Sequence, residues 1–323
     1  MKQYRFIILG NIQNYYSYFL YGALEGAIHC GAWAKTVQLV NRSVKDIKDE
    51  INFMKPHFIL CHMIFGPLRY EILEMLYNFR KSFGTKVVYH MGDAREVPRY
   101  PKPIDDFVDL ALVNNGIGDK FTDIWKIPCI HWPYMALYQK DIADFDPRYA
   151  CKMAFTGELS SSQHHAPRTK FIQELKNKID IKIFPTPETG NTRFQTAELA
   201  ASADSILGMQ MGTNIPLYLD VRPWQYSGAG ALYFHDRCKA MDTFFKPDYH
   251  YISYERNNAN HLMEQYNKYV LNKEEGSKIR KQGFEFCQKY HSTQQRVQMI
   301  IDYFEGKDLQ PIYLWSLKEK GLI

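Results

Sequence analysis

The sequence predicts two α/β domains in tandem, each built on a doubly wound parallel sheet. Three observations lead to this prediction. The chain has 323 residues, more than the length at which a single hydrophobic core usually divides. Short apolar runs alternate with segments of helical spacing, an order typical of a parallel sheet covered on both faces. A polar stretch at 139–148 interrupts this order, which then restarts.

In the first half, apolar runs of four or five residues predict strands and amphipathic stretches predict helices. The first helix is expected to stop at Gly31, a common helix-ending signal. The expected strands are 6–9, 36–40, 58–61, 86–90, 110–113 and 128–131, and the expected helices are 14–29, 44–54 and 68–83.

The second half repeats the pattern after the polar stretch. Its expected strands are 153–155, 181–184, 205–209, 231–234 and about 249–253; its expected helices begin near Pro167 and Pro223 and span 196–203, 258–271, 273–290 and 293–304. We therefore predict domains at 1–146 and 147–304, a hinge near 141–150, and a tail at 305–323 that packs back toward the first domain. Two such domains in tandem would turn the carboxyl ends of their strands, where ligands bind, toward a shared cleft.

The composition is that of an ordinary globular protein, with 46% apolar and 23% charged residues. No apolar run reaches the roughly 18 residues of a membrane span, and the first apolar run leads straight into polar residues. We expect no signal peptide and a cytoplasmic location.

The cysteine spacing and the net charge argue against some classes of function. The six cysteines are far apart and form no C-x-x-C pair, which predicts reduced thiols without a metal knuckle or a disulfide framework. The net charge is +5, and residues 148–323 carry 23 basic against 19 acidic side chains, which allows an anionic ligand without demanding nucleic acid. The Walker A, G-x-G-x-x-G, G-x-S-x-G and H-E-x-x-H patterns do not occur, which argues against kinase, dehydrogenase, hydrolase and zinc-protease functions.

The stretch 222–231, RPWQYSGAGA, is the most informative part of the chain. It predicts a short helix that ends at glycines and leads into a buried strand. A cation, an amide, two hydroxyls and backbone N–H groups meet there, which suits a phosphorylated or sugar-bearing ligand at a helix N-terminus. The alternative is a helix C-cap without a ligand.

Other features of the second half occur in a recognisable order around this stretch. Phe155-Thr-Gly157 ends a strand, Arg168 opens a helix, and Arg222-Pro-Trp-Gln225 precedes two glycines. Ser253-Tyr-Glu255 and a late Gly283 with His291-Ser-Thr293 follow. Together they resemble the C-terminal half of the GT-B glycosyltransferases of the spore-maturation CgeB-like group, with the pattern F-x-G, an Arg-opened helix, R-x-F-E-x-x-x-x-G and a late G-x₇-H-T. The resemblance covers about 150–304.

This resemblance implies a GT-B fold, with two doubly wound Rossmann-like domains that face a central cleft. It implies a hexosyl- or pentosyltransferase that moves a sugar from a nucleotide-diphosphate sugar, with a UDP-sugar favoured, to a hydroxyl acceptor without a metal ion or other cofactor. The donor-binding residues that it implies are Gly157, Arg168, Arg222, Gln225, Tyr226, Ser227, Gly228 and Gly230.

Within this set, Arg222 and then Arg168 are expected to hold the diphosphate, and a surface or interdomain ion pair is the alternative for each. Gln225 stands where the family has Glu, the residue expected to hold the ribose hydroxyls. Its amide can donate and accept hydrogen bonds but offers no charge-assisted bond. For the glycines the alternative role is turn geometry alone.

On the N-terminal side, Asp93 follows a strand and is predicted to be the catalytic base, with His90 beside it. The alternatives are a helix N-cap at Asp93 and a core histidine at His90. Asn11 and Tyr15, after the first strand, are expected to line the acceptor side, although a tyrosine there could equally pack in the core. The adjacent His164 and His165 lack a third ligand at a defined spacing, which favours a loop that closes over the donor rather than a metal site.

Two other functions fit the same sequence. One is a phage-type DNA glycosyltransferase that acts on a flipped, hydroxymethylated base. The other is a non-catalytic nucleotide- or sugar-binding protein that keeps the fold, for which Gln225 is the main support. The acceptor could therefore be a glycan, a protein or modified DNA.

Overall fold

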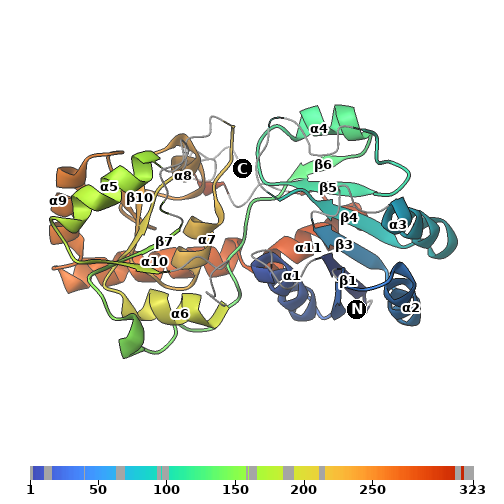
Figure 1. The fold of residues 1–323 in the computed structure, drawn as a ribbon, viewed down its shortest axis with the longest axis horizontal. Coiled ribbons are helices and arrows are strands. Elements are labelled where there is room, and N and C mark those ends of the chain that lie inside the picture. Colours follow the sequence, from blue (N-terminus) through green and yellow to red (C-terminus); the bar gives the residue numbers. More distant parts are fainter. Residues whose placement is uncertain are drawn as a thin grey trace. The chain divides into compact units, whose positions relative to one another are not determined.

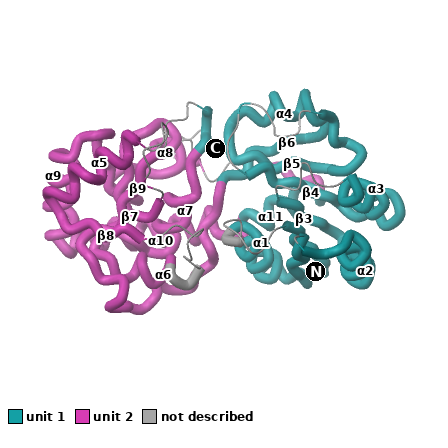
Figure 2. Tube along the Cα trace, viewed as in Figure 1, with its two compact units in different colours: residues 1–133, 215–218, 296–305 teal, residues 134–214, 219–295, 306–323 magenta. Residues whose placement is uncertain are grey.

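The computed structural model describes two compact units (Figure 2). The first comprises Met1–Pro133, Ile215–Tyr218 and Arg296–Glu305, and the second Tyr134–Asn214, Leu219–Gln295 and Gly306–Ile323. Within these bounds the described residues are 3–10, 17–39, 41–62, 70–92, 96, 102–157, 159, 166–184, 193–210, 215–309 and 314–315.

The first unit is built on a six-stranded parallel sheet in the order β2-β1-β3-β4-β5-β6 (Figure 1). The strands are β1 (Arg5–Gly10), β2 (Trp33–Gln38), β3 (Phe58–His62), β4 (Lys86–His90), β5 (Leu110–Val113) and β6 (Cys129–His131). Its helices are α1 (Ser17–His29), α2 (Val44–Met54), α3 (Tyr70–Phe83), α4 (Gly118–Trp125) and α11 (Thr293–Phe304). The six predicted strands are all confirmed, whereas α4 was not predicted.

Helices cover both faces of this sheet, as the alternating pattern predicts. On one face α2, α3 and α4 pack their apolar residues onto Ile7, Ile59, Val87 and Ala111 of four neighbouring strands. On the other face lie α1 and α11, whose Phe304 contacts Phe58 of β3 with ring centroids 5.5 Å apart.

The second unit has a five-stranded parallel sheet in the order β11-β10-β9-β7-β8. The strands are β7 (Met153–Thr156), β8 (Ile181–Phe184), β9 (Ile206–Gly208), β10 (Tyr233–Asp236) and β11 (Ile252–Tyr254). The helices are α5 (Ala166–Lys176), α6 (Arg193–Ser202), α7 (Val221–Gly228), α8 (Lys239–Phe244), α9 (Ala259–Tyr269) and α10 (Lys273–Tyr290), with a 3-10 turn, η1, at Pro147–Tyr149. α8 was not predicted.

Two of the helix starts that differ from the prediction move a candidate residue. α5 begins at Ala166, so Arg168 is its third residue and does not open it. α7 begins at Val221, because the Asp220 carboxylate accepts the Arg222 backbone N–H at 3.0 Å and caps the helix before Pro223. Arg222 therefore lies in the first turn of α7.

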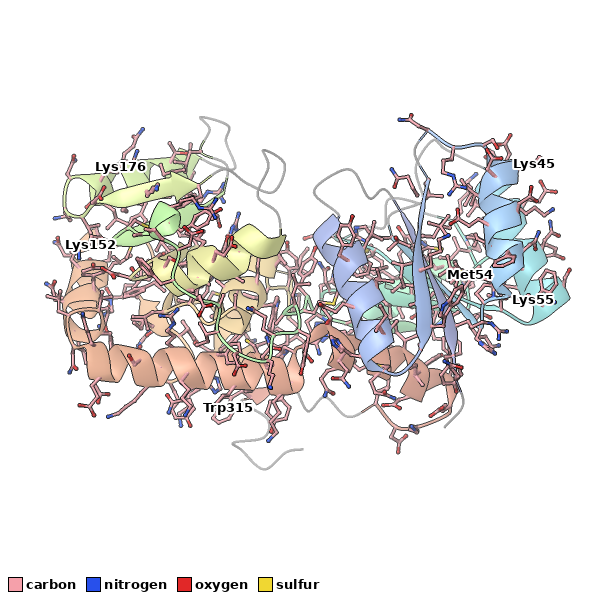
Figure 3. All side chains as sticks on the ribbon, turned by 90° about the horizontal axis from the view of Figure 1, so that it is seen from below. Lys45, Met54, Lys55, Lys152, Lys176 and Trp315 are labelled. Carbon is pink, nitrogen blue, oxygen red and sulfur yellow. The ribbon has the colours of Figure 1, made fainter. Side chains whose placement is uncertain are left out.

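The end of the chain is divided between the units. Residues 296–305, most of which lie in α11, belong to the first unit, and Trp315 belongs to the second. There Trp315 lies beside α10 (Figure 3), with its ring 5.8 Å from Phe286 and 4.8 Å from His250. Within the described part of the tail, Trp315 thus packs in the second unit, whereas Glu305 belongs to the first, where its carboxylate accepts from the Tyr4 hydroxyl at 2.7 Å.

All six cysteines are free thiols, as predicted. No helix among the described residues is both long and apolar enough to cross a membrane.

Candidate functional site

The strand order of the second unit reverses between β7 and β9. β7 leads to β8 on one side, and the chain then returns to β9 on the other. In doubly wound sheets, ligands bind outside the carboxyl ends of the strands at such a reversal. The residues that follow β7 and β9, Gly157 and Met209, therefore mark the expected ligand edge of this unit.

Arg222 lies at this edge. Its Nε donates to the carbonyl of Thr156, the last residue of β7, at 3.0 Å. Its Nη1 forms an ion pair with the Asp220 carboxylate at 2.6 Å, and about a fifth of the side chain is exposed. The sheet and the helix together hold the guanidinium at the end of β7.

Asp220, which the sequence analysis missed, is the nearest negative group to this guanidinium that the structure describes. Its two carboxylate oxygens cap α7 and pair with Arg222. A bound diphosphate would compete with Asp220 for both partners. An acidic residue just before a predicted helix is a sequence signal for such a cap.

Arg168 is almost fully buried, and its guanidinium lies 5.6 Å from the centre of the Phe155 ring. This burial argues against a surface ion pair, one of the two ion-pair alternatives that the sequence left open.

Three predicted donor-binding residues on α7 are buried inside the unit. The Gln225 amide donates to the Thr196 hydroxyl at 2.9 Å, and the Tyr226 hydroxyl donates to the Thr156 hydroxyl at 2.7 Å. The Ser227 side chain lies toward α10, near Gly283. These contacts support a packing role, and donor binding by the three residues stays a prediction.

Glycine is needed at each of three candidate positions for a different structural reason. Gly157 has φ +148°, and a Cβ there would lie 3.0 Å from Arg222 Nη2, so a larger residue would crowd the guanidinium. Gly230 has φ +84° and forms the turn after α7. A methyl group at Gly228 would overlap the Ala136 side chain, so this glycine allows close packing.

The carboxyl ends of β9 and β10 carry a second charged cluster that the sequence analysis missed. The fully buried Asp236 accepts from the Gln210 backbone N–H at 2.8 Å and from Arg256 Nε at 2.5 Å. Arg256 also donates to the Gln210 carbonyl at 3.2 Å. These bonds link Arg256 to the carboxyl ends of β9 and β10, next to the reversal point.

In the first unit, His90 is fully buried at the end of β4. Its Nδ1 lies 2.8 Å from Nδ1 of His62, at the end of β3, and Phe19 stacks on both rings at 4.2 and 4.4 Å. Burial, and next the neighbouring His62, hold the pKa of His90 well below its usual value, so the ring is neutral. This is the environment of a core histidine, the alternative to a catalytic one.

The same edge carries Asn114, directly after β5. Its side chain is 1% exposed, and among the described residues no group bonds either its Oδ1 or its Nδ2. A buried polar group without a partner costs about 1–3 kcal/mol. The sequence signal for this site is a polar Asn-Asn pair directly after the apolar run 110–113.

Five candidates, Asp93, Asn11, Tyr15, His164 and His165, lie outside the described residues. In the part of the chain that is described, no group of three or more His, Cys, Asp or Glu side chains gathers as metal ligands would.

Comparison with known proteins supports a fold that is found in glycosyltransferases. Residues 168–302, which include Arg168, Arg222 and Gln225, match the family model described as glycosyl transferase-like. No curated protein sequence matches the chain.

Three solved structures are similar over nearly the whole chain. A glycosyltransferase from Rickettsia africae has a TM-score of 0.64 at 10% identity and covers 95% of this chain and 99% of its own. HepE of Anabaena, in complex with UDP and glucose, has a TM-score of 0.56 at 8% identity and covers 94% and 100%. T4 phage BGT, in complex with its UDP-glucose substrate, has a TM-score of 0.58 at 10% identity and covers 94% and 100%.

At these identities the likeness concerns the fold. The two parallel-sheet units and the similar glycosyltransferase structures assign the GT-B fold, which confirms the predicted fold class.

Proposed function

We propose that this chain, which has the GT-B fold, transfers a sugar from a UDP-sugar to a hydroxyl acceptor without a metal ion. One observation carries the proposal. Arg222, within the segment that matches the glycosyl transferase-like model, holds its guanidinium beside Gly157 at the point where the strand order reverses. The similar structures that contain UDP or UDP-glucose support a UDP-sugar as the donor.

In the proposed reaction, the acceptor oxygen forms a bond to the anomeric carbon while the bond from that carbon to the diphosphate breaks. The acceptor proton passes to a base, for which Asp93 is our candidate. Negative charge grows on the departing diphosphate, and Arg222 with the first turn of α7 would stabilise it. His90, buried and neutral, would support the end of β4 three residues before Asp93.

The test is calorimetric titration with UDP, GDP, ADP and CMP, together with UDP-glucose hydrolysis. We expect UDP to bind and Arg222→Ala to weaken it about 10- to 100-fold, because a charge-assisted hydrogen bond contributes about 1.5–3 kcal/mol. Arg148→Ala is the matched control, since Arg148 forms an exposed ion pair in the same unit. Binding of none of the four nucleotides would contradict the proposal.

Two alternatives are separated by simple measurements. Nucleotide binding without hydrolysis or transfer would support a non-catalytic binding protein. Salt-sensitive binding to hydroxymethylated duplex DNA would support the phage-type DNA glycosyltransferase.

A further inference from the structure

The turn Ile215–Tyr218 belongs to the first unit, whereas the chain returns to the second unit at Leu219. A backbone hydrogen bond of 3.3 Å between its first and last residues closes the turn. Pro216 is its second residue, and Leu217, its third, has φ +53°. A turn with proline second and a positive φ third normally has Gly or Asn at that third position. A leucine there is strained, and such strain persists only where neighbouring contacts hold the backbone.

Two residues at the carboxyl edge of the first unit's sheet hold this turn. Gly116, three residues after β5, donates its backbone N–H to the Pro216 carbonyl at 2.6 Å. His131, the last residue of β6, forms a hydrogen bond with the Leu217 backbone. Because this bond favours the protonated ring, the imidazole is the donor and the Leu217 carbonyl is the acceptor. The peptide groups on both sides of the strained residue are therefore fixed.

Gly116 is a glycine because the turn approaches it closely. A Cβ at this position would lie 3.1 Å from the Pro216 carbonyl oxygen and 3.2 Å from Leu217 Cδ1. Any side chain would push the turn away from the edge of the sheet.

Very little chain separates the turn from the candidate donor site. Only Leu219, which is buried, lies between Tyr218 and Asp220. One residue spans at most about 3.6 Å, so a shift of the turn is passed on to Asp220. The Asp220 carboxylate accepts the Arg222 backbone N–H and pairs with the Arg222 guanidinium. The position of the turn therefore affects the start of α7 and the guanidinium that it carries.

We propose that Gly116 and His131 of the first unit are positioning residues for the donor, because the turn that they hold places Asp220 and Arg222 for the diphosphate. This inference rests on the proposed binding of a UDP-sugar at Arg222. If the turn is released, the strained Leu217 backbone relaxes and the cap of α7 loosens. The guanidinium then loses its fixed place, and the affinity for the diphosphate falls.

The test compares Gly116→Ala with Gly118→Ala in the full chain by calorimetric titration with UDP. A Cβ at Gly118 would lie 3.2 Å from the Cys129 carbonyl oxygen and 3.3 Å from the Val113 side chain, so it crowds the same loop to a similar degree without pressing on the turn. We expect Gly116→Ala to weaken UDP binding at least about fivefold and Gly118→Ala to change it less than about twofold. Urea unfolding checks that both variants are folded.

Two further comparisons separate positioning from a general loss of structure. His131→Phe removes the bond to Leu217 and should also weaken UDP binding, whereas His131→Asn, which keeps a side-chain N–H, should weaken it less. In the Arg222→Ala background, Gly116→Ala should have no further effect on UDP binding, because the turn acts through Arg222. Equal effects of the two glycine substitutions, unchanged binding in His131→Phe, or additive effects of Gly116→Ala and Arg222→Ala would overturn the inference.

Hydrogen exchange keeps this inference separate from the proposed function. Gly116→Ala should speed up exchange in the first turn of α7, at residues 221–224, whether or not UDP binds, because the Asp220 cap loosens. Faster exchange in this variant, with no UDP binding by the unmodified chain, would refute the donor site and leave the link from the turn to α7 standing. UDP binding by the unmodified chain, with unchanged exchange in Gly116→Ala, would refute this inference and leave the donor site standing.

Discussion

At the scale of single residues, contacts within the protein place the Arg222 guanidinium at the proposed ligand site and also occupy it. Its guanidinium is fixed by Thr156 and paired with Asp220, and the same carboxylate caps α7. The sequence identified Arg222 because a cation next to helix-ending glycines is a local pattern. It did not reveal the bond to Thr156, because those residues are 66 positions apart.

Asp220→Asn should strengthen UDP binding about three- to tenfold. The amide oxygen can still cap α7, while the loss of charge releases the guanidinium for the diphosphate. Calorimetry measures the effect, and Asp204→Asn, which removes an exposed ion pair with Lys152, is the control. Weaker UDP binding by Asp220→Asn would mean that Asp220 positions Arg222 and does not compete with the ligand.

His250 should make the protein less stable in acid. Its Nδ1 accepts the Lys246 backbone N–H at 3.1 Å, and burial, then the nearby Lys246 charge, lower its pKa from 6.5 to about 3. The folded protein therefore keeps the ring neutral. As the pH falls below 6.5, the unfolded chain takes up a proton that the folded chain refuses, and stability falls until the pH reaches about 3.

His250→Asn, which retains an acceptor for Lys246, should remove this contribution of up to about 1.4 kcal/mol per pH unit. Urea unfolding at pH 7.5, 6.0 and 4.5 measures the slope, and the exposed His29→Asn is the control. An equal slope in the variant and the unmodified chain would exclude His250 as a source of the acid sensitivity.

At the scale of elements, apolar runs predict the buried central strands well, but they predict edge strands and strand ends poorly. β2 begins three residues before its predicted start, because half-exposed residues such as Lys35 hide an edge strand from a hydropathy pattern. β10 extends to the buried His235 and Asp236, which are polar and were not counted. α4 was missed because only Phe121 and Trp125 of its eight residues are buried.

The packing of α7 on α10 depends on small residues from both helices. A methyl group at Gly283 would overlap the His250 carbonyl, and a Cβ there would also meet the Ser227 side chain at 3.7 Å. Gly283→Ala should therefore lower the free energy of unfolding by about 1–3 kcal/mol, even though alanine favours a helix over glycine by about 1 kcal/mol.

Urea unfolding measures this effect, with Ser277→Ala at an exposed position of the same helix as the control. Higher stability in Gly283→Ala would show that α10 can move away from the His250 carbonyl enough to admit a methyl group.

At the scale of the whole molecule, the first unit is discontinuous in sequence. Residues 296–305 belong with Met1–Pro133, and they bury Val297, Ile300 and Ile301. The Trp132 Nε1 donates to the Arg296 carbonyl at 3.0 Å across 164 positions. The spacing of apolar residues predicts the helix at 293–304, but no local sequence pattern indicates which sheet this helix covers.

A chain truncated after Ser292 should lose protection mainly in the first unit. Hydrogen exchange should speed up in β1 and β3, where Phe58 loses its contact with Phe304, and change less in β9 and β10. A chain that ends at residue 309 retains α11 and is the control. Equal loss of protection in both sheets would show that the two units unfold together.

The position of α11 in the sequence also affects the order in which the two units can fold during synthesis on the ribosome. The second unit has its five strands and α5 to α10 available once residue 295 has emerged. The first unit, although it is synthesised first, has one sheet face covered by α1 alone until α11 follows (Figure 1). Phe6 and Phe58, stacked at 4.6 Å on that face, would meanwhile be open to chaperones and to wrong partners. The first unit, although its synthesis begins first, is therefore completed only after residues 296–305 have emerged.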